Sequence, residues 1–290
     1  MSLFVSQLLE QGLLENLNFT VGIVGSRKLL NYEELDDGWR LLGDRLTIIG
    51  FDADPDACDA ANREMSQRQE PWHEQHLPYV LGASQEERTL YVAKELACTS
   101  LLPPNEGYLQ RFEQLHDAMA LDFEIPVQTA TLDQVWLHEK LPTLDFLITD
   151  VQGADLEILQ GAEKILDQAL LVQSEVLFAP LYIGQAYFSD TEQWLRSRRF
   201  NFHSLTAFGR PRRRFTADVS PSNRVSKEQI LWGDALFCRD LWDTNGDFSD
   251  MQTHEHQVLK LACMMDLLGF SDYAYDALQT CAYSLEFTLI

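Results

Sequence analysis

Glycine and aspartate positions at the ends of two predicted strands could together hold a nucleoside. Gly25 closes the apolar run that begins at Phe19, and glycine there lets a ligand approach the backbone where a Cβ would collide with it. Asp52 closes the next apolar run, and its carboxylate could accept hydrogen bonds from both hydroxyls of a ribose. Asp52 could instead cap the helix that follows it. Each signal is common by itself, and the pair predicts a nucleoside site at one edge of a sheet.

Two further carboxylates stand at the ends of later strands and could handle a proton. Asp150 comes directly after the apolar run 144–149, and Glu175 lies near the end of the run 170–176. Because the catalytic crevice of an open α/β sheet lies at the carboxyl ends of its strands, either group could act as a general base or orient an acceptor hydroxyl. Asp150 could also cap the turn that contains Gly153, and both interpretations stay open.

Other polar groups predict no site of their own. His73 and His76 have a spacing that can hold a metal ion on a helix. Pro71 and Pro78 indicate a loop there instead, and no further ligand is evident, so we predict no metal site. Asp155 lies within a predicted helix and is expected to be solvated.

The elements that must position these residues alternate between strands and helices. Nearly continuous apolar runs predict strands at 19–25, 46–52, 79–81, 89–92, 144–149, 170–176 and 233–239. Periodic apolar residues predict helices at 3–17, 55–65, 154–166, 190–197, 253–268 and 271–287. This alternation indicates an α/β fold in which a mostly parallel sheet carries helices on both faces. We expect an N-terminal helix over 1–18, the main domain over 19–242 and a C-terminal helical annex over 243–290. The apolar residues of that annex must pack on the main domain or form a homodimer.

The composition excludes several classes of protein. Lys and Arg number 22 against 45 Asp and Glu, and a formal net charge of −23 opposes the binding of nucleic acid or of an anionic membrane. No apolar run reaches the roughly 20 residues that span a bilayer, and the N-terminus lacks the layout of a signal peptide. The five cysteines are scattered, so we expect unpaired thiols and a cytoplasmic protein.

A basic cluster interrupts this acidic chain. It consists of Arg196, Arg198, Arg199, Arg210, Arg212, Arg213 and Arg214. Guanidinium groups bind phosphate and carboxylate in a bidentate manner, so the cluster could mark a phosphorylated or acidic acceptor. It could also balance the acidic surface of the chain itself.

The middle of the chain resembles the FkbM methyltransferase family. The resemblance rests on Thr131-Leu-Asp133 followed by Leu144-Asp-Phe-Leu-Ile-Thr-Asp-Val-Gln-Gly-Ala-Asp-Leu-Glu-Ile-Leu-Gln-Gly-Ala162. Shorter stretches at 49–55, 98–104 and 175–185 are similar to other segments of the family, and the match extends over roughly 18–240.

This resemblance implies a class I methyltransferase fold, which is Rossmann-like, with a seven-stranded mostly parallel sheet, an antiparallel last strand and C-terminal helices beyond it. It implies S-adenosylmethionine as the cofactor and a hydroxyl of a sugar, a lipid-linked glycan or a polyketide-like molecule as the acceptor. Gly25 then corresponds to the cofactor loop and Asp52 to the ribose ligand. Ala83 and Ser84 fall where the adenine rests in the family.

The chain departs from the family pattern at two positions. Ile23 stands where the family has an acidic residue that helps to hold the methionine ammonium group of the cofactor, and Ile148 stands where the hallmark has a lysine. These departures leave an alternative open, namely a non-catalytic relative that binds a nucleoside weakly or serves as an interaction scaffold.

Overall fold

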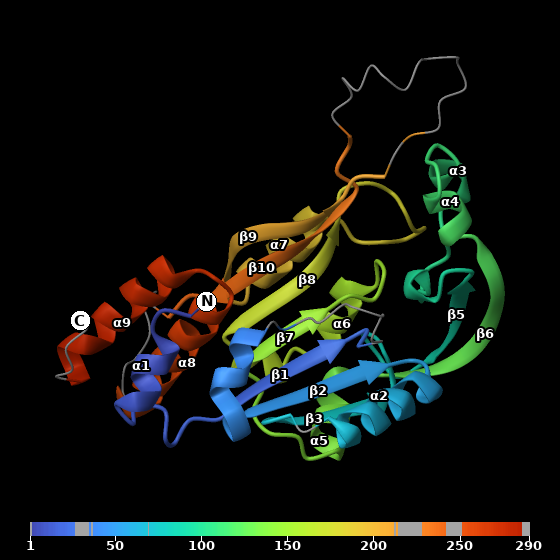
Figure 1. Cartoon of the computed structure of the whole chain (residues 1–290). Helices are drawn as coiled ribbons and strands as arrows, with labels where there is room; N and C mark the ends of the chain where they lie inside the picture. The colour runs from blue at the N-terminus through green and yellow to red at the C-terminus, as the bar shows by residue number, and fades with distance from the viewer. Residues whose placement is uncertain are drawn as a thin grey trace.

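A computed structural model describes the chain at residues 2–26, 35, 37–68, 70–211, 213, 228–241 and 251–285. Seven strands form the main sheet (Figure 1). In chain order they are β1 (Phe19–Val24), β2 (Leu46–Asp52), β3 (His73–Pro78), β7 (Phe146–Thr149), β8 (Leu171–Leu177), β9 (Phe200–Gly209) and β10 (Trp232–Arg239).

The order of strands in the sheet confirms the predicted fold class. The strands run β3-β2-β1-β7-β8-β10-β9, with every pair from β3 to β8 parallel. The last strand of the chain, β10, is antiparallel to both of its neighbours. Every residue of β1 and β7 is buried, and most are apolar, as expected for strands at the centre of a covered parallel sheet.

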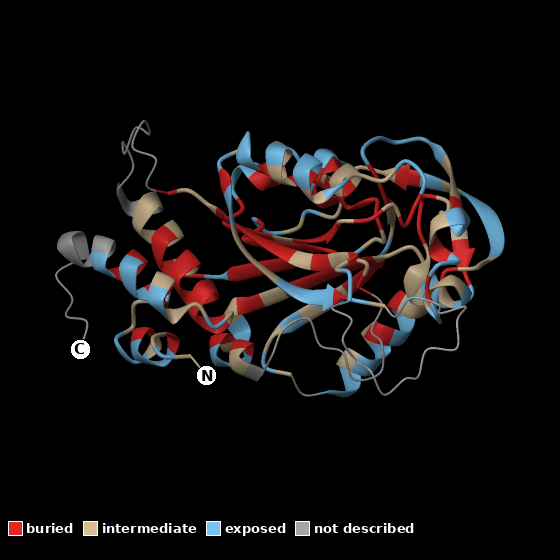
Figure 2. Ribbon diagram, turned by 90° about the horizontal axis from the view of Figure 1, so that it is seen from above, coloured by how far each residue is buried: buried red, intermediate tan, exposed pale blue. Residues whose placement is uncertain are grey.

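Helices cover both faces of this sheet, and Figure 2 shows the buried strands between them. One face packs against α5 (Leu132–His138), α6 (Asp155–Gly161) and α7 (Phe188–Arg196) in a single hydrophobic cluster. A second cluster joins the opposite face to α1 (Val5–Glu10), the 3₁₀ segment η1 (Asp37–Arg45), α8 (Met251–Leu267) and α9 (Ser271–Leu285). The outer helix α2 (Pro55–Gln67) follows β2 and leads to β3. Among the helices that the structure describes, none is long and apolar enough to cross a lipid bilayer.

Polar contacts tie the C-terminal helices to the rest of the chain. Lys260 on α8 forms an ion pair with the buried Asp145, at 2.8 Å between Nζ and Oδ1. The other oxygen of Asp145 accepts a hydrogen bond from the backbone N–H of Thr20. Asp266, also on α8, accepts hydrogen bonds from backbone N–H groups at the start of α1, including that of Phe4 at 2.8 Å. The annex therefore packs on the main sheet, while the domain boundaries and the homodimer stay predictions.

A second, three-stranded sheet stands beyond the carboxyl ends of the main strands (Figure 1). It contains β4 (Val80–Leu81), β5 (Glu87–Ala93) and β6 (Leu121–Ala130) in the order β4-β6-β5. The short segments η2 (Leu96–Cys98), α3 (Glu106–Leu109) and α4 (Leu115–Ala118) connect β5 to β6.

The sequence-based placement of the third strand was wrong. His73 and His76 lie in β3 of the main sheet and not in a loop, whereas the segment predicted as the third strand contributes β4 to the second sheet. β3 lies at the edge of its sheet and buries only His76 and Leu77, so it lacks the apolar run that marks the central strands.

Two predicted helices are shorter than expected. The first ends at Glu10 because Gly12 adopts a φ of 74°, which a helix cannot accommodate. The helix expected over 154–166 ends at Gly161, and a separate 3₁₀ turn, η3, covers Ile165–Asp167.

Candidate active site

A cavity of about 550 Å³ lies at the carboxyl ends of β1, β2, β7 and β8, between the main sheet and the second sheet. Gly25, Asp52, Asp150 and Glu175, four of the residues predicted from sequence, all line it. This volume is typical of pockets that enclose a cofactor and a small acceptor.

Gly25 forms the turn that ends β1. Its φ is 87°, a conformation that favours glycine, and its backbone N–H donates to the carbonyl of Phe51 at 2.9 Å. A Cβ at this position would lie 1.9 Å from the carbonyl oxygen of Asp150. Glycine is therefore required here by the neighbouring backbone as well as by any ligand in the cavity.

Asp52 ends β2, is half-buried and lines the cavity. One of its oxygens accepts a hydrogen bond from the backbone N–H of Asp54 at 2.8 Å. Asp54, and not Asp52, caps α2, because the Asp54 carboxylate accepts from the backbone N–H of Asp56 at 2.9 Å. The helix-cap alternative therefore applies to Asp54 and not to Asp52.

Ala83 and Ser84 lie outside the cavity lining. Both are exposed, and the Ser84 hydroxyl donates to the carboxylate of Glu86 at 3.0 Å. The preceding residues Tyr79 and Leu81 line the cavity instead. The structure thus brings four of the six predicted site residues together and not these two.

Asp150 directly follows β7 and is exposed to the cavity. The side chain of Gln152 donates to it at 2.6 Å. The protein walls around the cavity desolvate this carboxyl, and its pKa is raised above the ordinary value of an aspartate. The turn that Asp150 could alternatively have capped is held by Asp155, which accepts hydrogen bonds from the backbone N–H groups of Val151 and Gly153.

The expectation that Asp155 is solvated was wrong. Its side chain is buried because it faces back into the turn before α6, and burial raises its pKa to about 7. Helix periodicity alone could not place it, since the first residue of a helix can turn inwards to satisfy the N–H groups there.

Gln152 connects the carboxylates of the site. Besides Asp150, its Nε2 reaches Glu175 at 3.5 Å, and its Oε1 accepts from the hydroxyl of Tyr182 at 3.0 Å. It adopts a φ of 59°, which is strained for a side chain of this kind and is typical of functional sites. Sequence reasoning did not single out Gln152 or Tyr182. The available signal was that both fall inside the stretches that carry the family resemblance.

Glu175 and Asp234 are paired across the antiparallel strands β8 and β10, and both line the cavity. Glu175 is only 8% exposed, and burial, followed by the charges of Asp150, Asp155 and Asp234, raises its pKa well above its ordinary value. Burial and the nearby Asp150 raise the pKa of Asp234 to about 7. Asp234 was not predicted, although a charged residue inside an otherwise apolar strand was a visible signal.

A buried polar chain anchors the backbone next to Gly25. The Nδ1 atom of His76 lies 2.9 Å from the Ser26 hydroxyl, and its Nε2 lies 2.9 Å from a carboxylate oxygen of Glu74. The indole N–H of Trp72 donates to the other oxygen of Glu74. Within the described ranges, no group of three or more histidine, cysteine or acidic residues could hold a metal ion. His76 therefore has a structural role that fixes the glycine turn to β3.

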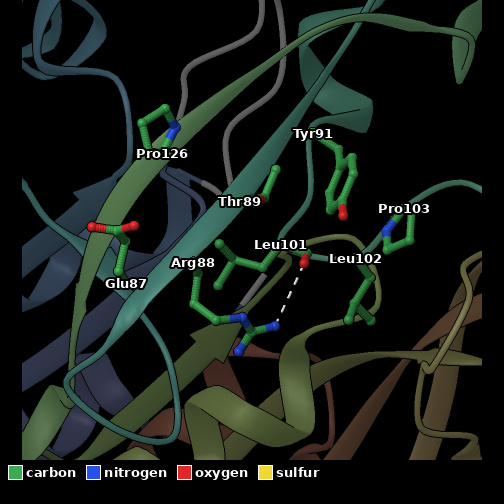
Figure 3. Close-up of a pocket in the computed structure, with 8 residues that line it drawn as sticks. All are labelled: Glu87, Arg88, Thr89, Tyr91, Leu101, Leu102, Pro103 and Pro126. Atoms are coloured by element: carbon green, nitrogen blue, oxygen red, sulfur yellow. Dashed lines mark hydrogen bonds between the residues drawn. The ribbon is translucent and has the colours of Figure 1, made fainter.

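A separate depression of about 410 Å³ lies on the second sheet and is lined by Arg88, Tyr91 and Pro103 among others (Figure 3). Arg88 donates to the carbonyl of Leu101 and forms an ion pair with Glu157 at 2.9 Å. Its charge is thereby compensated by Glu157 of α6, and no other Lys, Arg or His is found among the described residues that line this depression.

The described arginines of the basic cluster lie outside the main cavity. Arg196 pairs with Glu192, Arg198 pairs with Glu163, and Arg213 donates to the side chain of Gln229. Arg212 and Arg214 fall outside the described residues. These contacts fit the interpretation of the cluster as charge balance on the acidic surface.

The strand order of the main sheet, with its antiparallel last strand, is that of a class I methyltransferase. A family model for the methyltransferase FkbM domain matches residues 32–202, and the chain belongs to that family. The expected fold class, enzyme class and cofactor are thereby confirmed.

Solved methyltransferase structures resemble the chain only distantly. Magnesium protoporphyrin IX methyltransferase (ChlM) from Synechocystis PCC 6803 with bound S-adenosylmethionine is 10% identical, with a TM-score of 0.35 over 81% of this chain and 76% of that one. TrmK from M. capricolum in complex with S-adenosylhomocysteine is 7% identical, with a TM-score of 0.32 over 98% and 97%. At this level the similarity says nothing about the acceptor. No curated protein matches the chain in sequence.

Proposed function

We propose that the enzyme methylates a hydroxyl of a sugar, a lipid-linked glycan or a polyketide-like acceptor, with Asp150 as the proton acceptor. The observation that carries this proposal is the position of Asp150. It faces the cavity directly after β7, and its backbone lies against the Gly25 turn. A carboxyl group whose pKa is raised accepts a proton more readily than an ordinary aspartate.

The residues that line the cavity themselves fit the cofactor. The Gly25 turn brings backbone to its surface, and the carboxylate of Asp52 faces it at the end of the adjacent strand. S-adenosylmethionine supplies a methyl group from its sulfonium centre when bound. Asp52 would hold the ribose hydroxyls, and the Gly25 turn would accept the methionine part of the cofactor.

Asp150 would then remove the proton as the acceptor oxygen forms its bond to the methyl carbon. In an in-line displacement the protein mainly contributes proximity and proton removal. Gln152 donates to Asp150 and so fixes the direction of the carboxylate towards the acceptor. Glu175 reaches the same amide and could share the proton.

The acceptor side of the cavity carries no support for a phosphorylated or acidic acceptor. Five carboxylates and no Lys, Arg or His are found among the described residues that line the cavity. The cytoplasmic location predicted from sequence stays a prediction.

Calorimetric titration with S-adenosylhomocysteine, followed by transfer of labelled methyl groups from S-adenosylmethionine to a panel of hydroxylated acceptors, tests the proposal. We expect binding of S-adenosylhomocysteine and transfer to oxygen, read from the mass and the chemical shift of the product methyl group. Transfer only to nitrogen or carbon would overturn the O-methylation. The absence of binding at millimolar ligand would contradict the assignment of the cavity to the cofactor.

A further inference from the structure

Two carboxylates face each other on the acceptor side of the cavity without a cation between them. Asp234 on β10 stands directly opposite Glu175 on β8, and both side chains line the cavity. Like charges directly opposite each other on neighbouring strands destabilise a sheet. None of the described residues that line this cavity is a Lys, Arg or His.

The Glu175 carboxylate is also incompletely satisfied. The residue is 8% exposed, and its Oε2 is reached only by Gln152, at the long distance of 3.5 Å. No described residue donates to its Oε1, and this oxygen is not among the fully buried side-chain atoms that lack a partner, so it is accessible. Since Glu175 lines the cavity, this oxygen is available to a ligand there.

An aromatic ring completes the same part of the wall. Trp232 precedes Asp234 by two residues on β10, so the two side chains share a face of the strand, and Trp232 also lines the cavity. Its ring packs directly against Gly209, where a Cβ would come within 1.9 Å of it. A fixed indole beside two carboxylates is a favourable environment for an ammonium group.

The positive groups of the cofactor are too far away to pair with Glu175 and Asp234. β8 and β10 are the second and third strands from β1, which places them roughly 10 and 14 Å from it at about 4.8 Å per strand. In the proposed function the methionine part of the cofactor, which carries its positive groups, would lie at the Gly25 turn of β1.

We propose that the acceptor carries a protonated amine close to the hydroxyl that is methylated, and that Glu175 and Asp234 bind this ammonium group with the ring of Trp232 against it. An amino sugar or an aminated polyketide has this chemistry. The inference rests on the proposed function, because it takes the cavity to hold both the cofactor and the acceptor.

The rest of the wall fits an apolar body attached to that amine. Leu96, Phe123 and Ile125 line the cavity from η2 and β6, and between 38% and 51% of each is exposed. Apolar side chains that are exposed inside a cavity indicate contacts with an apolar ligand. The raised pKa values of Glu175 and Asp234 agree with a site that lacks its cation.

Two matched probes test the ammonium subsite. Hexyl 2-amino-2-deoxy-β-D-glucopyranoside and hexyl β-D-glucopyranoside differ only in the amine, and each is titrated into the protein saturated with S-adenosylhomocysteine. We expect the amine to bind about tenfold more tightly or better. The double variant Glu175→Gln, Asp234→Asn should reduce this ratio to about one, and Trp232→Leu should reduce it in part.

The control variant is Asp59→Asn, which removes one negative charge from an exposed position of α2 and should leave the ratio unchanged. Should the double variant fail to bind S-adenosylhomocysteine, the single variant Asp234→Asn gives the same readout. Equal binding of the two probes, binding of neither, or a preference that survives in the variants would overturn the subsite. If the unaltered protein does not bind S-adenosylhomocysteine, the proposed function fails, and the ratio measured on the protein alone still decides about the subsite.

Discussion

The two halves of the cavity are built by different means. On the β1–β2 side the lining includes the Gly25 turn, with its positive φ, and the carboxylates of Asp52 and Asp54, of which Asp54 caps α2. On the β7–β8–β10 side the lining includes the carboxylates of Asp150, Glu175 and Asp234, and the pKa of each is raised. Backbone geometry suits a cofactor that never changes, whereas side chains can be exchanged to select an acceptor.

The difference also concerns stability. The Gly25 turn is satisfied within the protein, since its N–H donates to Phe51. The β7–β8–β10 side holds its carboxyl groups in a desolvated environment, and this costs free energy whenever they are charged. We therefore expect substitutions on the two sides to separate chemistry, cofactor affinity and stability from each other.

The largest expected effect is that of Asp150→Asn on turnover. The variant keeps the shape of the side chain and removes its basicity, so kcat should fall roughly 10²- to 10⁴-fold. The affinity for S-adenosylhomocysteine, measured by calorimetry, should hardly change. A parallel loss of cofactor affinity would break the division between the two halves, and Glu175 would become the better candidate for the proton acceptor.

Asp52→Ala should have the opposite pattern of effects, because it should lower the affinity for the cofactor. Loss of charge-assisted hydrogen bonds to the ribose should weaken S-adenosylhomocysteine binding by about 1.5 to 3 kcal/mol. Asp56→Ala is the matched control, because it removes an exposed carboxylate from the first turn of α2, outside the cavity lining, and should leave the affinity unchanged. Equal loss of affinity in both variants would mean that the general negative charge near α2, and not the Asp52 carboxylate in particular, favours the cofactor.

Asp234→Asn tests how much the acidic groups on the β7–β8–β10 side of the cavity lower the free energy of unfolding, through its dependence on pH. The pKa of Asp234 is about 7 in the folded protein and is raised from 3.8, so wild type loses stability from this group as the pH rises through that window. Asp150 and Glu175 face it and carry the same sign of charge. The variant should therefore be more stable than wild type by about 1 kcal/mol or more at pH 8, and the gain should shrink towards pH 4. Urea unfolding at several pH values measures this difference, and a gain that does not vary with pH would contradict it.

The central strands could be predicted from the sequence because their apolar runs are continuous. β1, β2, β7, β8 and β10 all lie where such runs predicted strands, and the carboxylates at their ends were found by the same argument. β3 could not be found in this way, because an edge strand buries too few of its residues to leave a pattern.

The acceptor side of the site was harder to predict, for a physical reason. Asp234 meets Glu175 only through the antiparallel pairing of β10 with β8, which joins residues far apart in the chain. Trp232 and Gln152 likewise become part of the cavity through packing and through a backbone conformation that no periodicity marks. Sequence patterns locate the ends of strands, and tertiary pairing decides which side chains meet there.

The smallest expected effect is that of Ile23→Asp, which restores the acid that the family has on the first strand. Ile23 lines the cavity but is only 5% exposed, and its side chain belongs to the hydrophobic cluster under α8. The new carboxylate should lower stability, since a charge is placed in apolar surroundings.

The same carboxylate should tighten the binding of S-adenosylhomocysteine only a fewfold, by about 1 kcal/mol, because part of the attraction to the methionine ammonium is offset by its own desolvation. 5′-Methylthioadenosine lacks the amino acid part of the cofactor and is the matched ligand. Its affinity should stay constant while that of S-adenosylhomocysteine rises, and both are measured by calorimetry on protein shown to be folded. If both ligands gain equally, the acid acts through a general change in the cavity. If neither gains, the methionine ammonium lies away from Ile23, and the cofactor half is then specified by backbone and Asp52 alone.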